Sequence, residues 1–182
     1  MIIGLTGPNA SGKGEAAKYI ESKGFTYHSL SDILREEARR LNIEPLRENL
    51  IKLGNELRGK NGASFLAEQT IKRLTQEQNH IVDSIRNPAE IEALKRLDSF
   101  ILVGVDAPVE MRFKRGLDRK RPGDAQTIED FIEKEKKENK SDSQNQQLKK
   151  CLYFADIVII NDSTLEEFHK KIDDTIKKYK KT

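Results

Sequence analysis

The chain has 182 residues, which is enough for one globular domain with a sizeable hydrophobic core. Hydrophobic residues make up 36% of it, charged residues make up 35%, and the formal net charge is only +3. This small basic excess argues against a nucleic-acid-binding protein, and no apolar run is long enough to span a membrane. The single cysteine, Cys151, excludes an internal disulfide and is expected to be a packing residue. Together with the lack of a secretory leader in the opening residues, it predicts a cytoplasmic protein.

The first fourteen residues predict a strand, a glycine-bearing loop and a helix in direct succession. Residues 2–5 form a short apolar run typical of a buried strand, and an amphipathic stretch follows residue 14. Residues 7–13 fit the phosphate-loop pattern G-x-x-x-x-G-K. In such a loop, backbone N–H groups at a helix start converge on an anion, and the lysine adds charge against the outer phosphates. The alternative is a turn that binds nothing, but the flanking strand and helix favour a nucleotide site.

The loop departs from the usual motif at one position. Gly14 stands where a serine or threonine hydroxyl normally binds Mg²⁺, and Glu15 follows it. A metal would therefore have to be held by phosphates, water and some other carboxylate. The predicted nucleotide-binding residues are those of the loop and of the helix start: Gly7, Pro8, Asn9, Ala10, Ser11, Gly12, Lys13, Gly14 and Glu15.

A long helical segment is predicted between the second strand, at residues 25–28, and the third, at residues 80–83. Ser31 or Asp32 can cap a helix over about residues 32–41. Pro45 begins a helix that the stretch 59–62 ends, and a third helix covers about residues 64–76. The middle helix has leucines at packing intervals: Leu46, Leu50, Leu53 and Leu57. This segment is too long for a tight crossover, so we expect it to form one wall of a substrate cleft.

The third predicted strand ends in an acidic residue, Asp83. A carboxylate at the end of a buried strand is costly unless it has a cation or a hydrogen-bond donor beside it. Asp83 is therefore the candidate ligand of Mg²⁺, acting through water, although a helix cap or turn residue before Pro88 is the alternative. Arg86 follows in the loop at the carboxyl edge, where ligands bind in parallel α/β sheets.

A basic stretch follows the most apolar strand of the chain, residues 100–105, which is expected to be buried on both faces in the middle of the sheet. Its basic residues are Arg112, Lys114, Arg115, Arg119, Lys120 and Arg121. Arg112, Arg115 and Arg119 fall at i, i+3 and i+7 and share one helix face. Charge runs are usually solvated faces. Here, however, only one acid interrupts the run, and it follows a strand that ends at the same sheet edge as the phosphate loop. A mobile arginine-bearing flap is therefore favoured.

The rest of the chain predicts a helix before residue 97, a charged helix at 128–140, a polar turn at 141–147 and a last strand at 157–160. Residues 151–155 are expected only to lead into that strand. A final helix carries an apolar face from Leu165 to Tyr179, and its tail from residue 177 is expected to fray. The three histidines are isolated in the sequence, so none is assigned to a metal.

These residue types predict phosphoryl transfer. That reaction needs little covalent help and depends on alignment of donor, acceptor and metal and on neutralisation of the developing charge. Arginine suits the task because its planar fork binds phosphate bidentately and is always charged. A basic flap can also close over the site and exclude water, which would otherwise accept the phosphoryl group. No Ser-His-Asp or cysteine-nucleophile arrangement is visible.

Three segments and a set of four arginines resemble the adenylate kinase and nucleoside monophosphate kinase family. Residues 7–14 are similar to its phosphate loop, which also often has glycine after the lysine. Ser29-Leu-Ser-Asp-Ile-Leu-Arg35 resembles the segment S-T-G-D-x-L-R, which implies that Arg35 grips the acceptor phosphate. Val82-Asp-Ser-Ile-Arg86 resembles a shortened D-G-F-P-R segment, which implies a second acceptor ligand at Arg86. Arg112, Arg115, Arg119 and Arg121 resemble the lid arginines as a group, without a one-to-one alignment. Among them, Arg112 is predicted to bind the acceptor, and Arg115 and Arg119 are predicted to act in catalysis.

Residues 155–167 are also similar to the end of dephospho-CoA kinases and of archaeal kinase-like proteins, the latter nearly end to end. The resemblance implies a single α/β domain with the three-layer α/β/α P-loop kinase fold and a five-stranded parallel sheet of order 2-3-1-4-5. It implies an acceptor-binding helical insertion at about 30–76 and a lid at about 110–142. ATP and Mg²⁺ are the implied donor and cofactor, with a nucleotide acceptor, and Asn161 and Asp162 are implied near the adenine.

Two alternatives to a nucleoside monophosphate kinase stay open. One is a dephospho-CoA kinase, whose hydroxyl acceptor would need a base, and Asp32 lies near the place expected for it. The other is a nucleotide-binding regulator that hydrolyses ATP slowly and signals by flap closure. The paired arginines Arg35 and Arg86 favour a kinase, since a switch needs no acceptor-phosphate site. The sequence leaves a monomer and a homodimer equally open.

Overall fold

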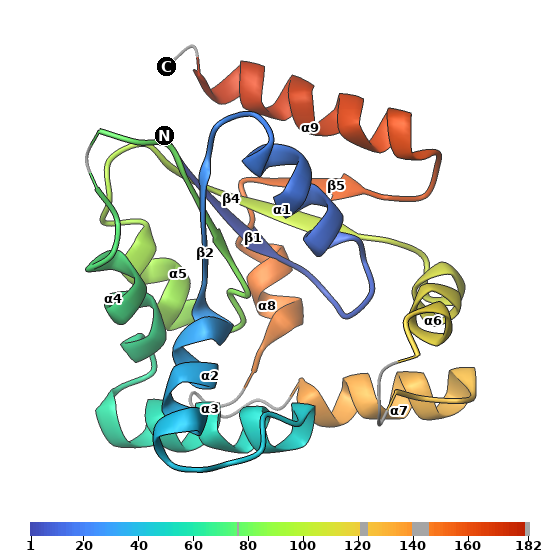
Figure 1. Ribbon diagram of the computed structural model, residues 1–182. Coiled ribbons are helices and arrows are strands. Elements are labelled where there is room, and N and C mark those ends of the chain that lie inside the picture. Colours follow the sequence, from blue (N-terminus) through green and yellow to red (C-terminus); the bar gives the residue numbers. More distant parts are fainter. Residues whose placement is uncertain (76, 121–123, 140–145, 181–182) are drawn as a thin grey trace.

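A computed structural model shows one sheet of five parallel strands in the order β2-β3-β1-β4-β5 (Figure 1). The structure describes residues 1–75, 77–120, 124–139 and 146–180. The strands are β1 (Ile2–Thr6), β2 (Thr26–Ser29), β3 (His80–Asp83), β4 (Phe100–Asp106) and β5 (Ile157–Ile160). Ile3 of β1 lies opposite Ile81 of β3 on one side and Ile101 of β4 on the other. The predicted fold class and strand order are confirmed.

Helices cover both faces of the sheet, so the molecule has three layers (Figure 1). On one face, α1 (Lys13–Glu21) and α9 (Leu165–Lys180) bury their apolar sides against alternate strand residues such as Ile3 and Val103. On the other face, the core includes Val82, Leu102 and the buried Cys151. β4 contributes to both cores and is buried from Ile101 to Val105, as predicted for an interior strand of a parallel sheet.

The segment between β2 and β3 is helical, as predicted, and consists of α2 (Leu30–Arg40), α3 (Arg47–Asn61) and α4 (Phe65–Ile71). Several of its predicted details are wrong. Ser29, not Ser31 or Asp32, caps α2, because its hydroxyl accepts the Ser31 N–H. α3 begins at Arg47 and not at Pro45, but it ends within the predicted stretch 59–62: it runs through Gly59 and stops before Gly62, which has a φ of 101°. A single glycine within a helix lowers helix stability by only about 1 kcal/mol relative to alanine, which is not enough to end the helix at Gly59.

Packing is also uneven along the predicted leucine stripe of α3. Leu53 is buried, but Leu46 lies before the helix and is 46% exposed. α4 ends at Ile71, five residues before the predicted end, and residue 76 lies outside the described residues. The insertion is therefore held by fewer apolar side chains than its sequence suggests.

The second half of the chain contains α5 (Pro88–Leu94), α6 (Val109–Asp118), α7 (Ile128–Glu138) and α8 (Leu148–Tyr153). α8 was not predicted, because its six residues are too few to show helical periodicity. α6 and α7 pack through the rings of Phe113 and Phe131, 5.9 Å apart. The expected fraying from residue 177 is wrong up to Lys180, where α9 ends. Residue 121 and residues 141–145 of the predicted turn at 141–147 lie outside the described residues.

Candidate active site

The phosphate loop leaves β1 and closes at the first turn of α1. Positive φ angles occur at Gly7 (140°), Ala10 (59°) and Gly12 (108°). A Cβ at Gly7 would lie 2.0 Å from the Val105 carbonyl oxygen, and one at Gly12 would lie 2.1 Å from the Asn161 side-chain nitrogen. Both glycines are therefore required by the close approach of neighbouring backbone and side chain as well as by their own conformation.

Alanine substitution should have opposite effects at Gly12 and Gly14. Gly12→Ala combines backbone strain with a clash, so we expect it to lower the free energy of unfolding by about 1–3 kcal/mol and to weaken nucleotide binding. A Cβ at Gly14 meets nothing within 4 Å, and α1 begins at Lys13, so Gly14→Ala should stabilise the fold by about 0.5 kcal/mol. Denaturant unfolding compares the two variants. A Gly12→Ala protein as stable as the parent would contradict this loop geometry.

Lys13 lies at the end of the loop and folds back over it. Its Nζ donates hydrogen bonds to the carbonyl oxygens of Gly7 at 2.7 Å and Pro8 at 2.8 Å. The ammonium group therefore lies against the concave backbone that a phosphate would occupy in a phosphate loop. This is the position that the predicted role of Lys13 requires.

Charged groups from several segments surround the Lys13 ammonium. Burial lowers the pKa of Lys13 from its ordinary value of 10.5 to about 8, and the negative charge of Asp83 opposes that shift. The positive charges of Arg86, Arg47 and Arg119 lower the pKa further. Several cations thus act on a single partly desolvated point, which favours the binding of a polyphosphate anion.

Triphosphate binding should therefore take up protons at about pH 8.5, because a bound anion raises the pKa of Lys13 again. At about pH 7 the amine is charged in both the free and the bound protein, so no uptake is expected there. As the pH rises through about 8, the free protein loses the proton first and the affinity falls. Titration calorimetry in two buffers of different ionisation enthalpy measures the uptake. Equal heats at about pH 8.5 in both buffers would contradict the shifted pKa.

Asp83 ends β3, the strand beside β1, and is only 9% exposed. Its Oδ2 accepts a hydrogen bond from the Tyr27 hydroxyl at 3.2 Å, whereas its Oδ1 is buried with no hydrogen-bond partner among the described residues. Burial and the negative charge of Asp83 raise the pKa of Tyr27 to about 12, so the phenol stays protonated and donates. Tyr27 therefore fixes one carboxylate oxygen and leaves the other available.

The free oxygen of Asp83 fits a ligand of Mg²⁺. In nucleotide sites that ion is held by one or two carboxylates together with phosphates and water. Among the described residues, no three His, Cys, Asp or Glu side chains are grouped to hold a metal by themselves. Most of the ligands would therefore come from the nucleotide and from water, as the glycine at position 14 also requires.

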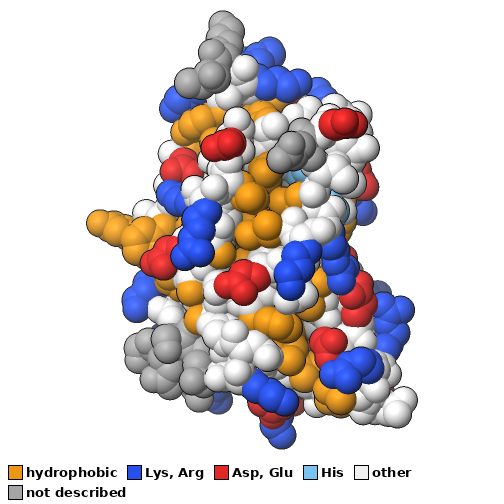
Figure 2. Space-filling view, turned by 90° about the vertical axis from the view of Figure 1, so that its left-hand side faces the viewer, with side chains coloured by type: hydrophobic (Ala, Val, Ile, Leu, Met, Phe, Trp, Pro, Cys, Tyr) orange, Lys and Arg blue, Asp and Glu red, His pale blue; other side chains and the backbone are white. Residues whose placement is uncertain are grey.

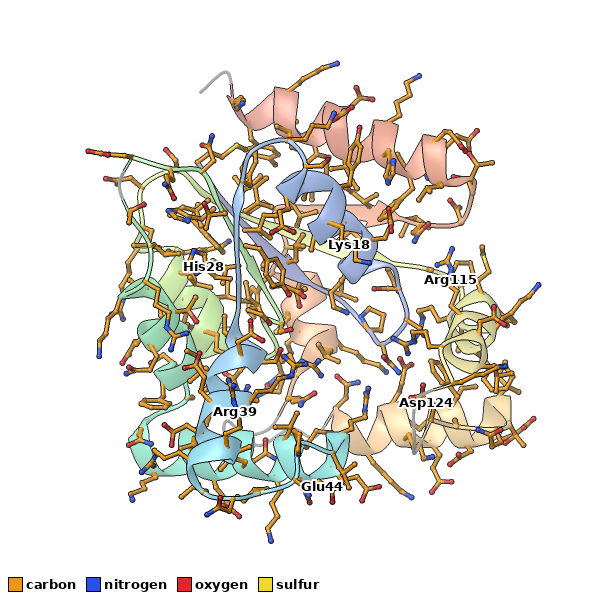
Figure 3. The ribbon with its side chains drawn as sticks, in the orientation of Figure 1. Lys18, His28, Arg39, Glu44, Arg115 and Asp124 are labelled. Carbon is orange, nitrogen blue, oxygen red and sulfur yellow. The ribbon has the colours of Figure 1, made fainter. Side chains whose placement is uncertain are left out.

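The predicted arginine face of α6 is turned toward the phosphate loop. Arg119 donates from Nη2 to the Asn9 side-chain oxygen at 3.1 Å, and Arg112 donates from Nη1 to the Asn9 carbonyl oxygen at 3.4 Å. The Arg115 side chain extends from α6 to the end of β5, where its Nη2 donates to the Asn161 carbonyl oxygen at 3.1 Å (Figure 3). Three of the four predicted lid arginines thus lie around the phosphate loop and the end of β5, and the fourth, Arg121, lies outside the described residues.

Arg112 is the most deeply packed of the three. It is 8% exposed, donates from Nε to the Ala107 carbonyl oxygen at 2.9 Å and forms an ion pair with Glu135 of α7. Its guanidinium also lies 5.5 Å from the centre of the Phe131 ring. These contacts join α6, α7 and the phosphate loop, which favours a supporting role over direct acceptor binding.

Asn161, predicted near the adenine, holds the phosphate loop in place. It is 7% exposed, and its Nδ2 donates to the Ser11 carbonyl oxygen at 2.9 Å. Asp162 is exposed and pairs at 3.1 Å with Lys171, whose hydrogen bond lowers the pKa of Asp162. The contact of either residue with a nucleobase stays a prediction.

Glu15 points toward α9, where its Oε1 lies 2.9 Å from His169 Nε2. The His169 ring in turn stacks on Tyr19 with ring centres 3.8 Å apart. The acidic side chain at the end of the loop is thus drawn toward α9 by a partner that the sequence did not indicate.

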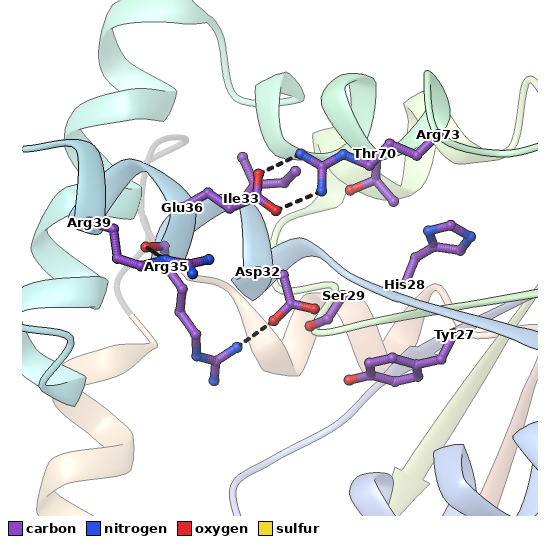
Figure 4. A pocket seen from close by; sticks show the side chains of 10 residues that line it. All are labelled: Tyr27, His28, Ser29, Asp32, Ile33, Arg35, Glu36, Arg39, Thr70 and Arg73. Atoms are coloured by element: carbon purple, nitrogen blue, oxygen red, sulfur yellow. Dashed lines mark hydrogen bonds and ion pairs between the residues drawn. The ribbon is translucent and has the colours of Figure 1, made fainter.

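A cavity of about 260 Å³ lies among β2, α2 and the end of α4 (Figure 4). It is lined by Tyr27, His28, Ser29, Asp32, Ile33, Arg35, Glu36, Arg39, Thr70 and Arg73. The predicted acceptor residues Asp32 and Arg35 share this wall, with 2.8 Å between Asp32 Oδ1 and Arg35 Nη1. Figure 2 views the side of the molecule where α4 lies and shows acidic and basic side chains interspersed around hydrophobic patches. Because Tyr27 lines the cavity and contacts Asp83, the cavity adjoins the candidate metal ligand.

Arg86 lies where three segments meet. Its Nη1 donates to the Gln146 side-chain oxygen at 3.0 Å, its carbonyl oxygen accepts the Gln147 N–H at 2.7 Å, and its own N–H donates to Glu90 Oε2 at 2.8 Å. The predicted acceptor arginines Arg35 and Arg86 thus belong to different walls, one on α2 and the other after β3.

Sequence reasoning missed Tyr27 and Arg47. Tyr27 falls inside the predicted second strand, and nothing in a four-residue strand shows that its hydroxyl reaches Asp83. Arg47 begins α3, and its charge acts on Lys13 only because the insertion folds back toward the phosphate loop. Helical periodicity carries no information about that placement.

Comparison with known proteins agrees with the fold and the loop. Residues 6–132 match the family model described as an AAA domain. With the strand order and the phosphate loop, this match defines a P-loop protein of kinase-like fold. More specifically, the chain belongs to the UPF0200 family. It is 32% identical over 177 residues to the UPF0200 protein of Sulfurisphaera tokodaii, covering 97% of this chain and 96% of that one. It is also 34% identical to the UPF0200/UPF0201 protein of Archaeoglobus fulgidus, but spans only 53% of that relative.

Two solved structures share the fold across nearly the whole chain. TT1252 from Thermus thermophilus has a TM-score of 0.61 at 20% identity, covering 98% of this chain and 97% of that one. Shikimate kinase from Aquifex aeolicus has a TM-score of 0.54 at 19% identity, covering 97% and 96%. The predicted resemblance to archaeal proteins is confirmed, whereas the closer resemblance to nucleoside monophosphate kinases stays a prediction. None of the described helices is long and apolar enough to cross a membrane.

Proposed function

We propose that this protein is an ATP- and Mg²⁺-dependent phosphotransferase whose acceptor is a nucleoside monophosphate. The observation that carries the proposal is the convergence of cations on one phosphate loop. Lys13 closes the loop, the charges of Arg86 and Arg47 act on it, and Arg119 of α6 donates to it. A protein that only binds a triphosphate needs the loop and its lysine, but a transfer site also needs cations for the acceptor phosphate and for the transferred group.

Each group has a place in the transfer step. An oxygen of the acceptor phosphate attacks the γ-phosphorus, the bond to the β,γ-bridging oxygen breaks, and ADP leaves. Lys13 and the loop amides hold the β- and γ-phosphates, while Arg35 and Arg86 hold the acceptor phosphate so that the reacting atoms are aligned. Arg115 and Arg119 neutralise the charge that develops on the transferred group. Asp83 would hold Mg²⁺, which would supply neutralisation of the phosphate charge.

A hydroxyl acceptor such as dephospho-CoA is the second candidate. It is favoured by Asp32, a carboxylate in the cavity wall that could accept a proton from an attacking hydroxyl. A phosphate acceptor needs no such base. Asp32 at present pairs with Arg35, so this role would require the pair to open.

Measuring ADP release from ATP and Mg²⁺ against a panel of acceptors tests the proposal. The panel contains the ribo- and deoxyribonucleoside monophosphates together with dephospho-CoA. Strong stimulation by one monophosphate is the expected result. Stimulation by dephospho-CoA alone would favour the second candidate, and a slow rate indifferent to every acceptor would indicate a regulatory ATPase.

Arg35→Ala should raise the KM for the acceptor by about tenfold to a hundredfold and leave the KM for ATP nearly unchanged. The reason is that Arg35 lies in the cavity wall on α2, whereas the donor is held by the phosphate loop. Arg40→Ala is the matched control, because Arg40 is an exposed arginine of the same helix that pairs with Glu37. Equal weakening of both substrates by Arg35→Ala would remove its assignment to the acceptor.

A further inference from the structure

An ion pair between Arg58 of α3 and Glu90 of α5 is buried beside the loop that carries Arg86. The two side chains are 2% and 0% exposed. Arg58 donates from Nε and Nη2 to Glu90 Oε1 at 2.9 Å and 2.8 Å. These two helices lie far apart in the sequence, so the pair joins the acceptor-side insertion to the segment that follows β3.

The second carboxylate oxygen of Glu90 holds the backbone of that segment. Glu90 Oε2 accepts the N–H groups of Arg86 at 2.8 Å and Asn87 at 3.0 Å. Asn87 in turn caps α5 by accepting the Ala89 N–H at 2.9 Å. One carboxylate therefore both closes the capping box of α5 and fixes the main chain at Arg86.

Hydrophobic packing alone does not account for the placement of α3. Leu53 is buried, but Leu50 and Leu57 are only partly buried and Leu46 is exposed. A buried ion pair contributes little net stability compared with apolar residues of the same volume, whereas it does impose a specific geometry. α3 begins with Arg47, whose charge acts on Lys13, so the geometry of α3 matters to the phosphate site.

We propose that the Arg58–Glu90 pair is a positioning device that holds two arginines of the acceptor side in register with the phosphate loop. Glu90 fixes Arg86 through its amide, and Arg58 fixes the helix that begins at Arg47. Neither Arg58 nor Glu90 touches a substrate in this scheme. The inference rests on the proposed transfer reaction, in which Arg86 holds the acceptor phosphate and the charge of Arg47 acts on Lys13 of the phosphate loop.

The double variant Arg58→Leu/Glu90→Gln tests the pair. Either single substitution leaves one partner buried and unpaired and can fail to fold, whereas the double variant removes both charges, and glutamine keeps an oxygen for the Arg86 amide. We expect a rise of about tenfold or more in acceptor KM, with little change in the KM for ATP, because a small misplacement of a binding group has that effect. The control is Arg40→Leu/Glu37→Gln, which removes an exposed ion pair within α2.

Amide hydrogen exchange gives a readout that needs no acceptor. In the double variant, the hydrogen-bonded amides 51–61 of α3 and 85–87 after β3 should exchange faster than in the parent, while those of β1 keep their protection. An unchanged acceptor KM would overturn the inference. It would also be overturned if the activity toward acceptor and ATP fell only in proportion to the fraction of folded protein. If the parent shows no acceptor-stimulated transfer, the proposed function fails by itself. In that case the hydrogen-exchange comparison tests the positioning role of the pair. Faster exchange at both segments supports it, and unchanged exchange at both segments rejects it.

Discussion

Replacing Lys13 by alanine should lower kcat/KM for phosphoryl transfer by a factor of about 10²–10³ while the protein stays folded. The Lys13 ammonium lies 2.7 Å from the Gly7 carbonyl oxygen at the mouth of the loop, where no other described side chain makes the same contact. Burial already lowers the pKa of Lys13 to about 8, so losing this partly desolvated charge should not reduce the free energy of unfolding. Initial rates and denaturant unfolding, measured on the same preparation, check both parts of this expectation.

The matched control is Lys18→Ala. Lys18 is an exposed lysine of the same helix, one and a half turns further on (Figure 3). Its removal changes the net charge by the same amount and should leave the rate unchanged. If Lys13→Ala kept its full rate, or if both variants lost activity equally, the phosphate loop would not be the donor site.

Asp83→Asn should have the second largest effect, a loss of about a hundredfold or more in transfer rate at fixed Mg²⁺. The substitution removes the buried, unpartnered oxygen that could hold the metal or its bound water. It also removes the negative charge of Asp83, which raises the pKa of Lys13, so that pKa should fall below about 8. Rates measured against Mg²⁺ concentration should show a weakened dependence on the metal, and metal-free nucleotide binding should persist.

Asp106→Asn separates the metal role from a general loss of charge at this edge of the sheet. Asp106 ends β4, which lies on the other side of β1 from β3, and its Oδ1 already accepts the Ala107 N–H at 2.8 Å, a bond that asparagine can keep. We expect its Mg²⁺ dependence to match that of the parent. Identical metal dependence in Asp83→Asn and the parent would exclude Asp83 as a ligand.

The local features of the site could be predicted from the sequence, and the long-range ones could not. The phosphate loop was predictable because its conformation is encoded within a few residues, including Gly7 and Gly12. The interior strands β1, β3 and β4 were predictable because strands buried on both faces of a parallel sheet are largely apolar runs, while the strand order followed from family resemblance. The partnership of Tyr27 with Asp83 and the approach of Arg47 to Lys13 depend on how the insertion folds back. Periodicity does not specify that arrangement.

The errors in the predicted elements have the same origin. α3 begins at Arg47, two residues after the predicted start at Pro45, and it passes through Gly59 to end within the predicted stretch 59–62, because tertiary contacts such as the buried Arg58 outweigh a small propensity cost. α8 escaped notice because it forms only where its buried face meets the sheet. In each case the deciding interaction joins segments that are distant in the chain.

The folded-back lysine has a consequence for how a nucleotide would enter. Its ammonium donates to two carbonyl oxygens of the loop, and these hydrogen bonds hold the loop in its phosphate-binding conformation before a ligand binds. When a triphosphate binds, Lys13 would exchange these neutral carbonyl acceptors for charged phosphate oxygens, and the loop would already be ordered. Nucleotide binding would then cost little conformational entropy in the loop. Selectivity among ligands would depend on whether a ligand carries phosphate oxygens that can replace the two carbonyl acceptors of Lys13.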